Sequence, residues 1–198
     1  MMRGKKKERI LRVLLKQPDG SLSLYRIAKD ADCSHVWVLK YLRQLQQKNL
    51  VEKTKVNDIN GLFSYWKEIN KYPLYREFNI QNPIDLLKKT KLPYALTTYY
   101  AENYVQKYLF PSRIDMYIKK RDAEQWKSVL TKQGLVGKGN MRLLIDDEHV
   151  FYCNIKKDGV RIVSIPQLIL DLLREEGVGI EAAQMLMEKE YHGVIRSI

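Results

Sequence analysis

The sequence predicts an α+β protein in two parts, with short helices and a β-hairpin first and strands flanked by helices after them. Apolar residues recur at helical spacing before residue 48, and short alternating runs separated by turn residues follow. Three prolines, Pro73, Pro83 and Pro93, discourage one continuous helix between the two parts. We therefore expect an N-terminal domain at residues 1–72, a linker at residues 73–91 and a C-terminal domain at residues 92–198.

Three short helices are predicted in the first part, beginning with one at residues 5–16. Ser23 and Ser34 suit the N-cap positions of the second and third helices, because a serine hydroxyl accepts a hydrogen bond from a free backbone N–H. The inward face of the third helix is predicted from apolar residues spaced i, i+4 and i+7: Val38, Leu42 and Leu45.

A β-hairpin is predicted after the third helix. Residues 50–56 alternate between apolar and polar, residues 57–61 contain strong turn formers, and residues 62–66 resume as a second strand. Three helices followed by a hairpin is the order of elements in a winged helix.

The segment from Ser34 to Lys53 resembles the winged helix-turn-helix transcription regulators. The resemblance rests on Val38-x-x-x-Leu42-x-x-Leu45, followed by the run Lys48-Asn49-Leu50-Val51-Glu52-Lys53. Asn49 stands where many of these proteins have Gly, and Asn also tolerates left-handed backbone geometry. The resemblance implies that the third helix enters the major groove of DNA and that the hairpin is the wing.

The outward face of the third helix then supplies the candidate DNA-reading residues, His35, Val36, Trp37, Lys40, Tyr41 and Gln44. Lys40 and Gln44 lie one turn apart, and we expect them to read bases, since Gln pairs with adenine and Lys with guanine or phosphate. Phosphate contacts are expected from basic residues on the wing, on its return strand and beside the second helix: Lys53, Lys55, Lys67 and Arg26.

Each of these assignments has a plain alternative. Lys40 and Arg43 can be solvated helix surface, and Trp37 and Tyr41 can pack on the wing instead of on DNA. The basic run at Arg3 and residues 5–7 is either an arm that lies along phosphate or a solubilising terminus.

Charge and composition narrow the class of protein. The chain has 198 residues and a formal net charge of +12, and 45% of its residues are hydrophobic, so it is globular and suited to an anionic partner. Residues 1–72 hold 16 Lys and Arg against 7 Asp and Glu, which places three quarters of the net charge there. No apolar stretch is long enough to span a membrane. Because Cys33 and Cys153 are far apart and match no metal-site spacing, we expect reduced thiols and a cytoplasmic protein.

The second part is predicted to alternate between helices and strands. Helices are expected at residues 95–108, 123–132, 166–176 and 180–191, and strands at residues 114–118, 141–145, 150–155 and 160–164.

Residues 92–191 resemble the nucleotidyltransferase-like domain of AbiEi-type antitoxins and related regulators. The resemblance rests on Tyr94-Ala95-Leu96-Thr97, Tyr100-Ala101, the strand with Asp115, the run Val-Ser-Ile-Pro-Gln-Leu-Ile-Leu-Asp-Leu at residues 163–172, and Glu181-Ala182-Ala183. It implies an interaction domain behind a winged helix. It also implies a cognate toxin of the nucleotidyltransferase class as partner, with this chain as an antitoxin that represses its own promoter.

The catalytic pattern of an active nucleotidyltransferase is incomplete in this sequence. Thr97-Thr98 stands where the family has Gly-Ser, and Asp115 is followed two positions later by Tyr117 instead of a second metal-binding carboxylate. We therefore expect a noncatalytic domain without metal or cofactor. The acidic turn at residues 146–149 is interpreted as a solvated turn and not a metal site. The Gly-Lys-Gly run at residues 137–139 is interpreted as a flexible connection and not a phosphate site.

Gln167 and Asp171 lie one turn apart on a predicted helix, and they either line a pocket or face solvent.

The sequence thus favours a transcription regulator that binds double-stranded DNA, associates with itself on DNA and does not enter a membrane. Two alternatives stay open. One is a nucleotidyltransferase enzyme targeted to nucleic acid, which would need a carboxylate folded next to Asp115 from a distant position. The other is a winged-helix adaptor that binds protein.

Overall fold

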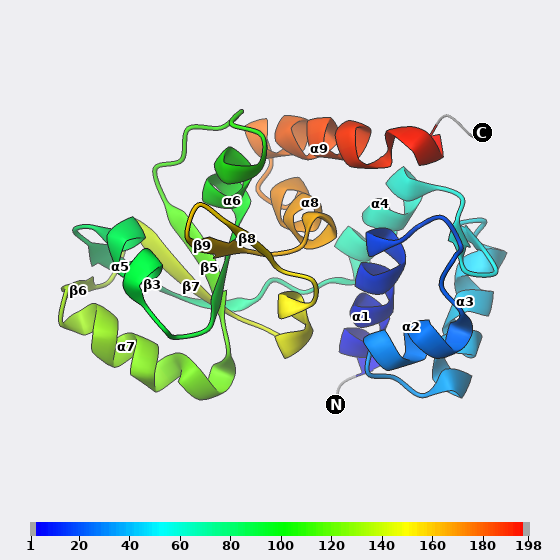
Figure 1. The fold of residues 1–198 in the computed structure, drawn as a ribbon, viewed down its shortest axis with the longest axis horizontal. Coiled ribbons are helices and arrows are strands. Elements are labelled where there is room, and N and C mark those ends of the chain that lie inside the picture. The colour runs from blue at the N-terminus through cyan, green and yellow to red at the C-terminus, as the bar shows by residue number, and fades with distance from the viewer. Residues whose placement is uncertain (1–2, 196–198) are drawn as a thin grey trace. The chain divides into compact units, whose positions relative to one another are not determined.

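The computed structural model describes residues 3–195, and the side chains of residues 5–193. The chain divides into two compact units, unit 1 (residues 1–71 and 184–198) and unit 2 (residues 72–183). Both contain helices and strands, so the predicted α+β class is confirmed (Figure 1).

Unit 1 is built mainly from helices. Its elements are α1 (Arg3–Lys16), α2 (Leu24–Asp30), α3 (His35–Gln47), β1 (Val51–Glu52), β2 (Lys55–Val56), α4 (Ile59–Ile69) and the C-terminal part of α9 (Val178–Ile195). The predicted N-caps are confirmed: Ser23 accepts a hydrogen bond from the backbone N–H of Arg26, and Ser34 accepts one from that of Trp37. Lys5, Lys6 and Lys7 belong to α1, so an arm formed by these lysines is wrong.

The hairpin is shorter than predicted. β1 pairs with β2 through Val51 opposite Val56, and the predicted return strand at residues 62–66 is instead part of α4. Asp58 explains the difference, because its carboxylate accepts a hydrogen bond from the backbone N–H of Gly61 at 2.7 Å and so begins a helix. The apolar residues that follow then fall at helical spacing and are buried: Ile59, Leu62, Phe63 and Trp66.

The core of unit 1 surrounds α1. The Arg12 guanidinium is buried and lies 5.3 Å from the centre of the Trp66 ring. Tyr191 of α9 packs edge-on against Phe63, with ring centres 6.0 Å apart, and donates a hydrogen bond from its hydroxyl to the Leu15 carbonyl at 2.9 Å. Residues far apart in the chain thus close one core.

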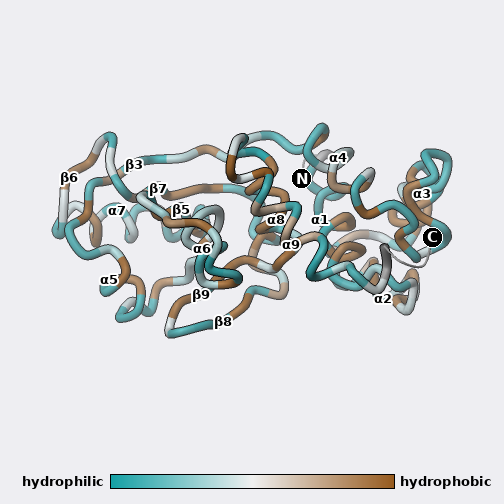
Figure 2. Tube along the Cα trace, turned by 90° about the horizontal axis from the view of Figure 1, so that it is seen from above, coloured by the Kyte–Doolittle hydropathy of each residue, from teal (hydrophilic) through white to brown (hydrophobic). Residues whose placement is uncertain are grey.

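Unit 2 contains a mixed seven-stranded sheet in the order β6-β3-β7-β5-β4-β9-β8. The strands are β3 (Leu74–Ile80), β4 (Tyr94–Thr97), β5 (Ile114–Ile118), β6 (Gly134–Val136), β7 (Met141–Ile145), β8 (Ile155–Lys157) and β9 (Val160–Ile162). The helices are α5 (Pro83–Lys89), α6 (Thr98–Val105), α7 (Ala123–Thr131), α8 (Ile165–Leu173), the first residues of α9, and two 3₁₀ turns, η1 (Lys120–Asp122) and η2 (Glu148–Phe151). All five residues of β5 are buried, and Figure 2 shows the hydrophobic residues of β5 and β7 inside the sheet.

The predicted linker at residues 73–91 is wrong, although the predicted boundary near residue 72 agrees with the division at residues 71 and 72. β3 lies between β6 and β7, and α5 follows it. The prolines that suggested a linker mark element starts, because Pro73 precedes β3 and Pro83 occupies the first turn of α5.

Other differences in unit 2 are local. β4 occupies residues 95–97 of the helix that was predicted at residues 95–108, and residues 148–151 form η2, so β8 begins only at Ile155. The strands predicted at residues 114–118 and 141–145 are confirmed, as is the helix of α7. Residues 184–198, which we had placed in the C-terminal domain, belong to unit 1.

Candidate functional site

Helix α3 has two distinct faces. Val38, Tyr41, Leu42 and Leu45 are buried in unit 1. Exposed residues form one continuous stripe along the opposite face: Val36, Lys40, Arg43, Gln44 and Gln47. His35 at the N-terminal end and Gln46 beside the stripe are also exposed.

Most of the predicted DNA-reading residues lie on this exposed face, and Tyr41 does not. Its side chain is 2% exposed, and its ring lies 5.5 Å from that of Trp37 and 5.5 Å from the Lys7 ammonium nitrogen. Tyr41 follows Val38 by three residues and precedes Leu45 by four, so it belongs to the buried stripe. Burial raises the pKa of its hydroxyl well above the usual value. Trp37 is half-buried.

Two residues of this stripe were missing from the predicted reading set, Arg43 and Gln47. They lie seven and eleven residues after Val36, so the helical spacing that identified Lys40 could have identified them. The exposed face therefore carries two cationic and two amide side chains within three turns.

The turn of the hairpin adds two exposed cations, Lys53 and Lys55. Lys53 adopts left-handed geometry with φ of 55°. The hairpin is held against residues 18–20, since the Thr54 hydroxyl donates to the Gly20 carbonyl at 3.0 Å and the Val56 N–H donates to the Pro18 carbonyl at 2.9 Å. Positive charge at this turn is thus presented from a fixed backbone.

The other two predicted phosphate contacts differ from expectation. Lys67 is exposed but lies on α4, not on a return strand. Arg26 is paired with Asp30 at 2.8 Å, so its charge is already partly compensated.

Unit 2 holds a second group of polar residues, which we call the buried polar cluster: Glu77, Thr97, Thr98, Arg113, Asp115, Tyr117, Arg142, Gln167, Asp171, Arg174 and Glu175. The pairing register explains how it forms. Thr97 of β4 lies opposite Asp115 of β5. On the next strand, β7, Arg142 pairs with Asp115 on one side and with Glu77 of β3 on the other. Alternating side chains on neighbouring strands therefore bring one row of polar groups to the same face of the sheet.

Asp115 is 1% exposed and paired with arginine. Arg113 donates two hydrogen bonds to its carboxylate, at 2.8 and 2.9 Å, and a second guanidinium, that of Arg142, lies 3.8 Å away. The Thr98 hydroxyl donates a further bond at 2.7 Å. Thr98 has φ of 51°, which is unusual for a β-branched residue, and it occupies the turn from β4 into α6.

Asp171 is the second buried acid of the cluster. Its carboxylate accepts hydrogen bonds from Thr97 at 2.5 Å, from Tyr117 at 3.0 Å and from Gln167 at 2.9 Å, and Arg174 lies at 3.3 Å. Burial raises the pKa of Asp171, while Arg174 and these hydrogen bonds oppose the shift. Gln167 and Asp171 therefore face the interior and not solvent.

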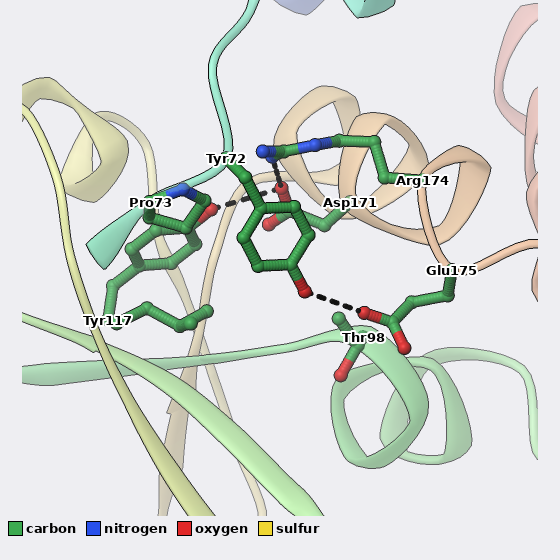
Figure 3. Close-up of a pocket in the computed structure, with 8 residues that line it drawn as sticks. Tyr72, Pro73, Thr98, Tyr117, Asp171, Arg174 and Glu175 are labelled. Atoms are coloured by element: carbon green, nitrogen blue, oxygen red, sulfur yellow. Dashed lines mark hydrogen bonds and ion pairs between the residues drawn. The ribbon is translucent and has the colours of Figure 1, made fainter. Parts of the chain in front are cut away.

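Tyr72 covers this part of the cluster (Figure 3). Its hydroxyl donates to Glu175 at 3.1 Å and accepts from Arg142 at 3.2 Å, and the Arg174 guanidinium lies 4.7 Å from its ring centre. Burial and the neighbouring Glu175 raise the pKa of Tyr72 to about 12. A cavity here is lined by Tyr72, Pro73, Thr98, Tyr117, Leu144, Asp171, Arg174 and Glu175. Its volume is only about 10 Å³, which suits a water molecule and not a nucleotide.

The cluster does bring distant carboxylates near Asp115, because Arg113 bridges Asp115 and Glu175. Each of these acids already faces a guanidinium, so fixed arginine charges occupy the place that a divalent cation would need. Among the side chains of residues 5–193, no three of the types His, Cys, Asp or Glu gather in a way that could hold a metal ion. The acidic turn at residues 146–149 is used locally, since Asp147 caps η2.

No protein-family description, curated protein or solved structure matches the chain. Within the part of the chain that the structure describes, no helix combines the length and apolar character needed to cross a membrane.

The pairing of Asp115 with arginines makes a testable prediction about stability. Asp115→Ala removes the carboxylate that accepts two hydrogen bonds from Arg113 in a largely buried site. Because a partly buried charge then loses its partner, we expect the free energy of unfolding to fall by about 3–5 kcal/mol. Denaturant unfolding followed by circular dichroism measures this change. Glu124→Ala removes an exposed acid of α7 and should change stability by less than about 0.5 kcal/mol. Equal effects of the two substitutions would contradict the assigned role of Asp115.

Proposed function

We propose that the chain is a sequence-specific regulator of transcription that binds double-stranded DNA through α3 and the β1–β2 hairpin. The observation that carries the proposal is the division of α3 into a buried apolar stripe and an exposed face with Lys40, Arg43, Gln44 and Gln47. An α-helix fits the width of the major groove, and polar side chains on its exposed face can then reach the hydrogen-bond donors and acceptors of the base edges.

The side chains on this face have different tasks under the proposal. The amide of Gln44 both donates and accepts hydrogen bonds and can pair with adenine, while Lys40 and Arg43 donate to guanine or phosphate. Lys53 and Lys55 contact phosphate from the hairpin and position the helix without reading sequence.

Unit 2 has a noncatalytic role in the proposal. The arginine pairing of Asp115 and Asp171 supports this, because a nucleotidyltransferase needs carboxylates that are available to metal. Unit 2 then associates with a partner protein or with a second copy on a repeated operator. The resemblance to AbiEi-type antitoxins would make that partner a cognate toxin and would make the regulated promoter the chain's own.

Specific binding is tested with the DNA upstream of the coding sequence and with a scrambled duplex of equal length, by fluorescence anisotropy. We expect the upstream duplex to bind about a thousandfold more tightly near physiological salt. Gln44→Ala should reduce this preference by about tenfold, because one base contact is lost. Gln125→Ala, an exposed glutamine of α7, is the matched control. Equal binding of the two duplexes that is unchanged after Lys40 and Gln44 are both replaced by Ala would favour a protein-binding adaptor, because charge alone would then account for DNA retention.

The hairpin lysines make a separate prediction about salt dependence. Replacing Lys53 and Lys55 by Ala should weaken binding to all duplexes similarly and lower the slope of log affinity against log salt by about 2. Replacing the exposed Lys156 and Lys157 of β8 removes the same charge elsewhere. If both double variants change the slope equally, the hairpin has no special part in binding.

A further inference from the structure

The loop at residues 106–112, between α6 and β5, is held in a defined conformation by buried polar groups. The Glu102 carboxylate is fully buried and accepts hydrogen bonds from the backbone N–H groups of Tyr108 at 3.2 Å and Leu109 at 2.7 Å. Asn103 donates to the Leu109 carbonyl at 2.7 Å, and Gln106 donates to the Ala182 carbonyl at 3.0 Å. A buried carboxylate that binds two backbone amides makes this loop rigid.

The fixed loop places an aromatic side chain in water. Phe110 is 94% exposed, the highest exposure among the large hydrophobic side chains in the described part of the chain. The loop backbone turns at Lys107, which has φ of 62°. This left-handed conformation costs free energy in a residue other than Gly. An exposed aromatic side chain on a loop held by hydrogen bonds is typical of the anchor residues of protein interfaces.

A hollow of about 460 Å³ lies beside this ring. It is lined by Tyr99, Tyr108, Leu109, Phe110, Pro111, Ser112 and Val178. Its volume falls within the range of ligand sites, and its aromatic and aliphatic lining suits an apolar side chain. A small molecule in the hollow would leave most of the exposed Phe110 ring in water, whereas a protein segment would cover both.

The charges around the hollow indicate the kind of segment. Glu176 and Glu181 are both exposed and flank Val178 in the sequence. Glu181 is positioned at the rim, because its carboxylate accepts a hydrogen bond from the Tyr108 hydroxyl at 2.9 Å. The Glu181 carboxylate at the rim, with the exposed Glu176 two residues before Val178, favours basic residues on the partner, and Lys or Arg can also stack on aromatic faces.

We propose that the hollow beside Phe110 is a docking site for a segment of a partner protein that has an apolar side chain flanked by basic residues. The apolar side chain fills the hollow and covers Phe110, and the basic residues meet Glu176 and Glu181. The inference rests on the association role proposed for unit 2, but it does not depend on DNA binding by unit 1.

The test uses the full chain and a library of random nine-residue peptides displayed on phage. Selection should enrich apolar residues flanked by Lys or Arg, and synthetic copies of the selected peptides should bind the chain in solution. Phe110→Ser should weaken their binding about thirtyfold, the usual effect of truncating an interface anchor. Glu181→Gln should weaken binding of the basic peptides and have less effect on copies with the basic residues changed to Ser.

Leu135→Ser is the matched control, because Leu135 is a 73% exposed apolar side chain of β6 that does not line the hollow. It should leave peptide binding unchanged. DNA binding of Phe110→Ser, measured in parallel, separates the two proposals, since we expect it to equal that of the unsubstituted chain. Failure to select peptides, selection of acidic peptides, or binding that survives Phe110→Ser would overturn the docking site. A dimer that Phe110→Ser abolishes in sedimentation would also overturn it, because the occupant would then be a second copy.

Discussion

The functional account depends on the burial of one stripe of α3. Val38, Tyr41, Leu42 and Leu45 remove their apolar surface from water, and fully burying such a side chain contributes roughly 1.5–3 kcal/mol. Rotation of the helix would expose this stripe and bury lysine or arginine, so packing determines which side chains face solvent. The exposed face with Lys40 and Gln44 is therefore a consequence of the core, and its amides and cations are presented from a rigid helix.

The position of a charge matters more than the total charge in this chain. Unit 1 contains most of the basic excess, yet Arg9 and Arg12 are buried, the first paired with Asp32 at 2.7 Å and the second against Trp66. Such cations stabilise the fold and are not available to phosphate. Lys53 and Lys55 are exposed, so they are the stronger candidates for phosphate contacts. In unit 2 arginines likewise compensate Asp115 and Asp171, which suits a structural cluster better than a metal site.

Local sequence signals predicted the first three helices of unit 1 well. Ser23 and Ser34 act on their own helix ends, so their role is readable from a few neighbouring residues. Residues 62–66 were assigned to a strand because a short apolar run fits either type of structure, and the deciding group was the Asp58 carboxylate just before it. Tyr41 was placed outward because the predicted buried stripe was too narrow.

Long-range pairing explains what the sequence did not predict in unit 2. β3 is a strand because it pairs with β7 and β6, which lie more than fifty residues later in the chain, and its own residues give only a weak signal. The buried polar cluster has the same origin. Asp115 was identified as a strand residue, but its partner Arg142 is known only once the register of β5 and β7 is known. The loop that presents Phe110 depends on Glu102, a single acid whose burial no sequence pattern announces.

The central claim is that α3 and the hairpin form the DNA-binding surface. The most direct measurement is an NMR titration of the isotope-labelled full chain with its upstream duplex, in which backbone amide shifts locate the contact. The account predicts saturable shifts concentrated at residues 35–47 and 53–55, with the amides of β4, β5 and β7 changed little. Saturable shifts confined to unit 2, or none in α3 at DNA concentrations that saturate binding, would contradict it.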